Sequence, residues 1–353
     1  MIERLSPRER VSLALRHQET DRVPIAMVCS GINPAARAEL ERFLGQRRGL
    51  TVEQYLKPLI DVVPVGPRYV GPTLPENTDI WGVRRRAVSY GLGSYDEIDH
   101  YPLAGAQSVA DLDAHDWPRI DWWDYESIRS AIARLDSQKE YCLLAANGNI
   151  FESSWYMRGF ERIFVDLMTQ PELAHAIFER VTSYFIEFFS RLLTAARGRI
   201  DLVFTADDIA GQNGLLMSLA MWEEHLKPYH VRLNDAVHQH GSKVIYHSDG
   251  AVMEAVPGLI DAGIDVLQAL QFDARGMDAV ALKASFGDRL CFEGGISVQK
   301  TLPFGTADQV RAEVTERKRI LGRSGGYILG PSHAIQDGTP PENIVALFDT
   351  AAS

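Results

Sequence analysis

The stretch Lys243–Gly250, KVIYHSDG, is the part of the chain that decides the fold. Lys243 to Tyr246 make a short apolar run that stops abruptly at His247 and Asp249, and Gly250 closes the polar cluster. Such a run predicts a short buried strand. Its tip would carry an imidazole and a carboxylate, where the backbone can aim both side chains at a ligand.

Seven other segments resemble this one, which gives eight short apolar runs along the chain. They are Val23–Met27, Ile60–Val65, Cys142–Ala146, Leu202–Ala206, Val244–His247, Ile264–Leu267, Leu290–Phe292 and Tyr327–Leu329. Amphipathic helical patterns lie between them, most clearly at Phe160–Met168, Pro171–Ala195 and Trp222–His240. Strands that alternate with helices predict parallel pairing, and eight such units predict an α/β fold closed into a (βα)8 TIM barrel.

Two segments depart from this alternation. Ser6, Pro7 and Glu9 form a capping box with proline at the first helical position, which predicts an N-terminal helix before the first strand. Thr78–Pro102 carries turn-forming glycines and predicts a β-hairpin inserted after the second strand. Because no linker or low-complexity tract divides the chain, we expect residues 1–353 to form a single domain.

Composition and charge exclude several classes of function. The 353 residues are 46% hydrophobic and carry a net charge of −11, which disfavours nucleic acid or an anionic membrane as a partner. The charged start MIERLSPRER and the absence of an 18-residue apolar run lead us to expect a cytoplasmic protein. Cys29, Cys142 and Cys291 are far apart, so their spacing suggests neither a disulfide framework nor a thiolate zinc knuckle.

Polar residues accompany the predicted strands, and a closed barrel gathers the strand ends into one funnel, where the chemistry of such barrels takes place. A single residue of this kind is more often a helix cap or a turn residue. The whole set predicts a site, with Asn147, Gln271 and Glu293 lining its pocket. In chain order the set is Cys29 and Ser30, Asp61 near the start of its run, Asn147, Asp207 and Asp208, His247 and Asp249, Gln268 and Gln271, Glu293, and Ser332 and His333.

Two histidines among carboxylates suit either a metal or acid–base chemistry. His247, Asp249 and His333 would supply the three ligands of a catalytic zinc site, with Glu223 or Asp207 as a fourth. The alternative is that both histidines only hydrogen-bond a substrate. Asp207 and Asp208 are adjacent, so we expect only one of the two carboxylates to face the funnel and act on the substrate.

Several segments, in order along nearly the whole chain, resemble the uroporphyrinogen decarboxylase superfamily, a group of (βα)8 barrels that includes cobalamin-linked methyltransferases. They are Arg8–Val11 with Asp21–Pro24, Thr205–Ala210, Lys227–Tyr229, His247–Gly250, Gly294–Ile296 and Thr339–Asn343. In the decarboxylases an arginine-rich segment grips the acidic substrate, whereas this chain has no arginine between Arg22 and Arg37. Asp61 lies where that branch has its pyrrole-binding aspartate, and His333 precedes Thr339 as the decarboxylase histidine does.

The zinc-dependent methyltransferase branch shows His-x-Cys at the fifth strand and a second cysteine before the Thr-Pro motif. Here these positions are His247, Asp249 and His333, so oxygen and nitrogen ligands replace both thiolates. This pattern is similar to methyltransferases of O-demethylase systems. The resemblance implies methyl transfer from a small methylated substrate, such as an aryl methyl ether, to the Co(I) corrinoid of a separate carrier protein. His247, Asp249 and His333 would hold zinc, and Asp207 or Asp208 would act on the substrate.

Three questions stay open from the sequence. A metal-free decarboxylase or lyase centred on Asp61 and His333 is the first rival function, and a binding protein that has lost catalysis is the second. The methyl donor cannot be named, and the resemblance leaves a homodimer open.

Overall fold

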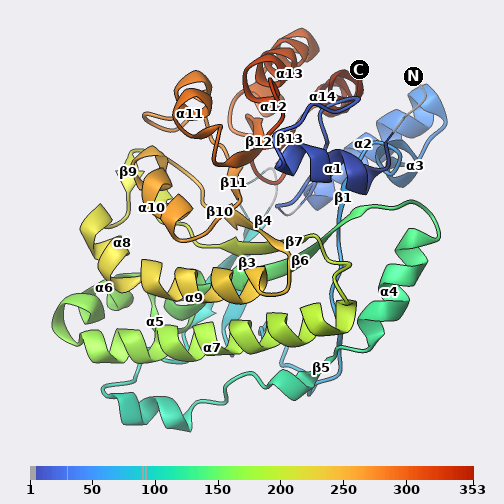
Figure 1. The fold of residues 1–353 in the computed structure, drawn as a ribbon. Helices are drawn as coiled ribbons and strands as arrows, with labels where there is room; N and C mark the ends of the chain where they lie inside the picture. Colours follow the sequence, from blue (N-terminus) through green and yellow to red (C-terminus); the bar gives the residue numbers. More distant parts are fainter. Residues whose placement is uncertain (1–4, 30, 90, 92–93) are drawn as a thin grey trace.

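The computed structural model describes residues 5–29, 31–89, 91 and 94–353 of the chain, so Ser30, one of the predicted strand-tip residues, lies outside the described part. A seven-stranded parallel sheet, in the order β1-β6-β7-β10-β11-β12-β13, curls into a barrel (Figure 1). Its strands are β1 Val62–Pro64, β6 Cys142–Asn149, β7 Leu202–Ala206, β10 Lys243–His247, β11 Val266–Ala269, β12 Cys291–Ile296 and β13 Tyr327–Pro331. Each overlaps one of the predicted runs, which confirms the predicted fold class.

The first predicted strand, Val23–Met27, does not form as a strand and is reduced to a bridge between Ile25 and Leu329 of β13. Pro24 has no N–H to donate, and the Ile25 N–H donates to the Asp61 carboxylate at 2.8 Å instead of to a strand carbonyl. The Ile25 carbonyl accepts from the Asp61 N–H at 2.8 Å. This short segment therefore spans the gap between β13 and the residue that precedes β1.

Helices surround the sheet. They are α1 Pro7–Leu15, α2 Pro34–Arg48, α3 Val52–Leu56, α4 Ser127–Asp136, α5 Ile150–Arg158, α6 Phe160–Thr169, α7 Pro171–Ala196, α8 Leu219–His225, α9 Lys227–His238, α10 Val256–Asp261, α11 Ala279–Phe286, α12 Thr301–Phe304, α13 Ala307–Leu321 and α14 Pro341–Ala352. Short 3-10 helices cover Val109–Ala114, Ile120–Trp122 and Met253–Ala255. The segment predicted as one helix, Trp222–His240, is split into α8 and α9 because Pro228 starts the second helix. No helix within the described residues is long and apolar enough to cross a membrane.

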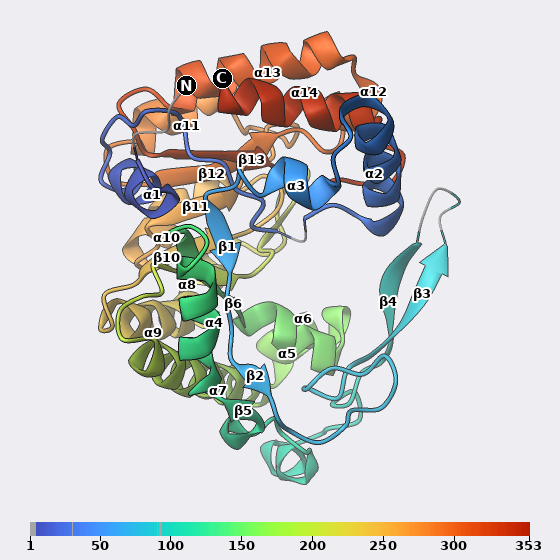
Figure 2. The same ribbon diagram turned by 90° about the vertical axis from the view of Figure 1, so that its right-hand side faces the viewer.

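In the part of the chain that the structure describes, three small antiparallel pairs lie outside the barrel sheet. They are β2 Arg68–Tyr69 with β5 Trp123–Asp124, β3 Arg84–Ser89 with β4 Ser94–His100, and β8 Ala210–Gly211 with β9 Gly214–Leu215. The β3–β4 pair is the predicted hairpin insertion, and Figure 2 shows it projecting from the side of the barrel. Its arginines pair with acids on the hairpin or just before it, at Arg84–Asp99, Arg85–Asp79 and Arg86–Glu97.

The barrel lumen is filled by alternate residues of the strands, such as Leu202, Phe204 and Ala206 of β7. Val11 and Leu15 of α1 pack into the same cluster and close the amino end of the barrel, with the predicted capping box of Ser6 and Glu9 at the helix start. Side chains two positions apart on a strand point to the same face. The residues two positions after the lumen residues Ile245, Val266 and Cys291 therefore also face the lumen, nearer its carboxyl end. They are His247, Gln268 and Glu293. The apolar lumen thus ends in a polar layer.

Candidate functional site

His247 is at the centre of the polar layer. The register places it beside Gln268, and Gln268 beside Glu293. The ring Nδ1 of His247 is hydrogen-bonded to the Gln268 side-chain oxygen. Because that oxygen can only accept, Nδ1 donates the proton in this bond, and Nε2, which bears the lone pair whenever the ring is neutral, faces the carboxylates of the funnel.

Side chains able to bind a metal surround this lone pair in two groups that share His247. One group is Cys29, His247 and His333, the other is Asp208, His247 and Asp249, and in each the donor atoms lie within 4.8 Å of one another. His247 Nε2 is 3.6 Å from Asp208 and 3.9 Å from Asp249, and His333 Nε2 is 3.9 Å from Asp249. Imidazole, thiol and carboxylate are the donors that Zn²⁺ takes in proteins, so this set fits the metal. We refer to these five residues as the donor cluster.

The two carboxylates of the donor cluster are held close together. Asp208 accepts a hydrogen bond from the Asp249 backbone N–H at 2.7 Å. Burial raises the pKa of Asp249, the two neighbouring imidazoles oppose that shift, and Asp208 adds to it. Such a repulsive pair is stabilised by a cation between its members.

The loop that carries Asp249 is fixed by Gln271, which the sequence places at the end of the neighbouring strand. The Gln271 side-chain oxygen accepts from the Gly250 N–H at 3.0 Å and from the Gln212 amide at 2.7 Å. Gly250 has a φ of +86°, and a Cβ there would lie 2.5 Å from the Gly211 carbonyl oxygen, so only glycine fits. Gln271 therefore positions Asp249, whereas the sequence predicted a pocket-lining role for it.

Asp207 faces away from the donor cluster. It is fully buried, and its two oxygens accept from the Phe151 and Glu152 N–H groups, each at 2.8 Å, at the start of α5. His230 Nε2 lies 2.9 Å from the same carboxylate. Of the two adjacent carboxylates, Asp208 is the one grouped with His247 and Asp249. The catalytic and ligand roles predicted for Asp207 do not agree with this geometry, since its carboxylate is occupied in fixing α5.

Glu152 is a site residue that the sequence interpretation missed. Its carboxyl accepts from the Asn149 amide at 2.6 Å and from the Tyr156 hydroxyl at 2.8 Å. Burial, followed by the charges of Asp208 and Asp207, raises its pKa to about 7. Asn149, Glu152 and Tyr156 are separated by three and by four residues, so each lies about one helical turn from the next, directly after a strand tip. This spacing is the pattern that could have revealed Glu152.

Glu293 belongs to the same polar layer and is paired in register with Gln268. Its side chain is fully buried, and neither carboxyl oxygen has a hydrogen-bond partner among the described residues. Burial raises its pKa to about 8, with the Gln268 amide acting in the opposite direction. The carboxyl is therefore neutral at pH 7, and Glu293 is paired in register with Gln268, the residue that orients His247.

The buried carboxyl of Glu293 makes stability depend on pH. Between the usual pKa of 4.5 and about 8, the unfolded chain has lost a proton that the folded chain keeps, so stability falls as pH rises through this window. Glu293→Gln removes this effect. Its stability relative to the wild type is expected to rise by about 2–5 kcal/mol from pH 5 to pH 8, and to level off above that. Urea denaturation of metal-free protein across this range measures the change. A difference between Glu293→Gln and the wild type that does not change with pH would contradict the account.

Similarity to known proteins places the chain in a family. A sequence model of the family Uroporphyrinogen decarboxylase (URO-D) matches residues 87–353. The chain belongs to the uroporphyrinogen decarboxylase family. It is 28% identical over 192 residues to the uroporphyrinogen decarboxylase of Anaeromyxobacter sp. (strain Fw109-5), with 54% of this chain and 51% of that protein covered. To uroporphyrinogen decarboxylase 2, chloroplastic, of Oryza sativa subsp. japonica it is 22% identical over 260 residues, with 71% and 62% covered.

The chain thus spans about half the length of the first of these curated relatives. Among solved structures, a methyltransferase from Methanosarcina mazei superposes with a TM-score of 0.67, at 20% identity and with 98% of both chains covered. At this identity the likeness shows the shared fold.

Asp61, to which the family resemblance gave a substrate-binding role, is not near the donor cluster. It precedes β1 and therefore lies at the amino end of the barrel, opposite the funnel. It is fully buried and accepts from Arg10 Nη1 at 2.6 Å, from Arg22 Nη1 at 2.7 Å and from the Ile25 N–H. In this member of the uroporphyrinogen decarboxylase family, the aspartate ties the N-terminal segment to the barrel.

Glu223, the predicted fourth ligand, is also remote from the donor cluster. It is exposed on α8, beside Gly258 of the outer helix α10. Cys29 lies in the cluster instead, because barrel closure brings the tip of the first segment next to His333 after β13. Of the predicted ligands, the structure therefore groups His247, Asp249 and His333.

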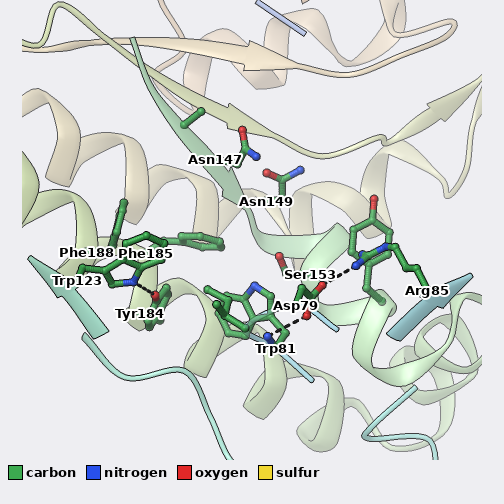
Figure 3. A pocket seen from close by; sticks show the side chains of 13 residues that line it. Asp79, Trp81, Arg85, Trp123, Asn147, Asn149, Ser153, Tyr184, Phe185 and Phe188 are labelled. Carbon is green, nitrogen blue, oxygen red and sulfur yellow. Dashed lines mark hydrogen bonds and ion pairs between the residues drawn. The ribbon is translucent and has the colours of Figure 1, made fainter. Parts of the chain in front are cut away.

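Asn147 lies in a cavity of about 440 Å³ beside the tip of β6 (Figure 3). The cavity is bounded by β6, by α5 and α7, and by the segment before the hairpin. Trp123 of β5 contributes to its wall. The cavity lies at the carboxyl end of β6, and its described lining includes no residue of the donor cluster.

Proposed function

We propose that this protein transfers a methyl group from a small methylated substrate to the Co(I) corrinoid of a separate carrier protein. The donor cluster at the carboxyl end of the barrel carries this proposal. Cys29, His247 and His333, with Asp249 or Asp208, would hold a zinc ion. Bound there, zinc supplies a Lewis acid for the heteroatom that carries the methyl group.

The residues of the chain have distinct tasks in this proposal. Gln268 fixes the tautomer of His247, and Gln271 fixes the position of Asp249. Methyl transfer from an oxygen breaks the C–O bond and leaves an anion that must gain a proton. Glu152, with a pKa of about 7, can hold that proton at its carboxyl beside Asp208.

Family membership keeps a second function in view, namely metal-free decarboxylation of an acidic substrate. The geometry gives it less support. Asp61 and His333, its two central residues, lie at opposite ends of the barrel. The funnel is lined by Asp208, Asp249 and Glu152, and these carboxylates would repel a polyanionic substrate.

The proposal is tested by mixing the zinc-loaded protein, a methyl donor and a carrier in the Co(I) state, and recording the corrinoid spectrum. We expect Co(I) to be consumed and methyl-Co(III) to form, in proportion to the demethylated product. Release of carbon dioxide from a candidate acid without corrinoid, together with no methyl-Co(III) from any donor, would contradict the proposal and favour the lyase.

A further inference from the structure

Two neighbouring residues of the polar layer, Gln268 and Glu293, have buried side-chain atoms without a hydrogen-bond partner among the described residues. These atoms are Nε2 of Gln268 and both carboxyl oxygens of Glu293. Both residues are fully buried, and they are paired in register on β11 and β12. A buried polar atom without a partner is costly, so the donor on Gln268 and the acceptors on Glu293 favour each other as partners.

The two ends of the Gln268 amide face different groups. Its oxygen accepts the hydrogen bond from Nδ1 of His247, so its NH2 group is left for another acceptor. Gln268 opposes the effect of burial on the pKa of Glu293, which is the effect of an N–H group beside a carboxyl, because a hydrogen bond donated to the ionised form lowers the pKa. The NH2 group therefore faces the carboxyl of Glu293.

The barrel leaves room for this carboxyl beside β13. A Cβ at Gly330 would lie 2.8 Å from Oε1 of Glu293 and 2.5 Å from the Ala26 carbonyl oxygen, so glycine is the residue that fits between them. Glu293 belongs to neither group of metal-binding side chains found among the described residues. A hydrogen-bonded link from Glu293 to the donor cluster therefore passes through Gln268.

Two influences compete for the proton of the His247 ring. Nε2 of His247 lies 3.6 Å from Asp208 and 3.9 Å from Asp249, and these carboxylates favour a proton on Nε2. A metal ion needs the lone pair of Nε2, which places the proton of the neutral ring on Nδ1. An amide beside Nδ1 does not decide between the two, because it can turn and present its NH2 group in place of its oxygen. An acceptor on the far side of the amide does decide, since the NH2 group then faces that acceptor.

We infer that Glu293 is a positioning residue that acts on His247 through the Gln268 amide. A carboxyl oxygen of Glu293 would accept from the NH2 group, which directs the amide oxygen to Nδ1 of His247 and leaves the Nε2 lone pair for a ligand. That the ligand is zinc rests on the proposed function, whereas the position of the proton rests on the chain of hydrogen bonds. Glu293→Leu removes the acceptor and keeps a side chain of similar size, so the amide is free to turn.

The position of the proton is measured by ¹⁵N NMR on the zinc-free full chain with labelled histidine. The measurement is made at pH 9, above the Glu293 pKa of about 8, where both carboxyl oxygens can only accept. His247→Ala assigns the His247 signals. We expect the proton on Nδ1 in the wild type and mainly on Nε2 in Glu293→Leu, where the nearby carboxylates decide.

Two further variants separate positioning from the loss of a buried carboxyl. Glu313→Leu removes another mostly buried carboxyl, on the outer helix α13, and as the matched control it should keep the wild-type NMR pattern. Gln268→Glu combined with Glu293→Leu should return the proton to Nδ1, because a carboxylate beside His247 can only accept. Circular dichroism establishes that each variant is folded.

Zinc affinity, measured by competition with a chromophoric chelator, is the second readout. Glu293→Leu should weaken zinc binding by about 10- to 100-fold, the usual effect of removing a group that orients a metal ligand. Glu293→Gln keeps an oxygen that can accept from the Gln268 amide, so its zinc affinity should stay close to that of the wild type.

The outcomes separate this inference from the proposed function. A proton on Nε2 in the wild type would overturn the positioning role without the need of a variant, and so would a proton on Nδ1 in Glu293→Leu. Equal loss of zinc affinity in Glu293→Leu and Glu313→Leu would overturn it as well. A wild-type chain that binds no zinc, but in which Glu293→Leu moves the proton as expected, would support the positioning role and count against the proposed function alone.

Discussion

Asp61→Ala is expected to destabilise the protein by about 3–5 kcal/mol, a large part of the stability of an ordinary domain. The substitution leaves Arg10, whose side chain is fully buried, and Arg22 without the carboxylate that both of them bind. It also removes the acceptor of the Ile25 N–H, by which the first segment joins the barrel. Removing the carboxylate leaves the two guanidinium groups buried without this counter-charge, and a buried charge without its partner is costly. The loss of stability is therefore large.

Urea denaturation monitored by far-UV circular dichroism measures this effect. Asp308→Ala removes a carboxylate that pairs with Arg311 on the surface, and it should cost less than about 1 kcal/mol. If Asp61→Ala instead unfolds at the wild-type urea concentration while a substrate no longer binds, the structural role assigned to Asp61 is wrong and the role implied by the family resemblance is right.

His247→Ala is expected to lower turnover by about 10³-fold or more while the barrel stays folded. His247 belongs to both groups of metal-binding side chains, so its loss leaves neither group complete. Its ring stacks on Phe204 and lies at a strand end, where truncation costs only local packing. The methyl-corrinoid assay with a zinc-loaded protein measures the change in turnover.

His100→Ala, at an exposed position of β4, is the matched control and should retain wild-type turnover. Circular dichroism of both variants establishes that they are folded. Substantial turnover in a folded His247→Ala protein would remove His247 from the chemistry and with it the proposed use of the donor cluster.

The strand pattern of the sequence predicts the barrel well, because seven of the eight apolar runs become strands of one parallel sheet. Position within a strand then decides which end of the barrel a residue reaches. His247 follows its strand and reaches the funnel, whereas Asp61 precedes β1 and lies at the other end. The geometry does not support the role predicted for Asp207 for a related reason, because the side chains of neighbouring residues at a strand end point to opposite sides.

Residues that approach each other only through closure of the barrel were harder to predict. Cys29 and His333 are more than 300 positions apart, and no local spacing rule joins them. Glu223 has the right chemistry, but the break at Pro228 puts it on a separate outer helix. Glu152 owes its raised pKa first to burial and then to the charges of Asp208 and Asp207, which follow the next strand, and the sequence of its own helix shows neither cause.

The zinc content of the purified protein tests the central claim most directly. The wild-type chain is purified without chelator, supplemented with zinc, freed of excess metal and analysed by atomic emission, beside His247→Ala treated in the same way. The account predicts about one tightly held zinc per wild-type chain and a loss of that zinc in the variant. No retained zinc in the wild type, with or without supplementation, would contradict the account and make His247, Asp249 and His333 hydrogen-bonding groups of a metal-free lyase.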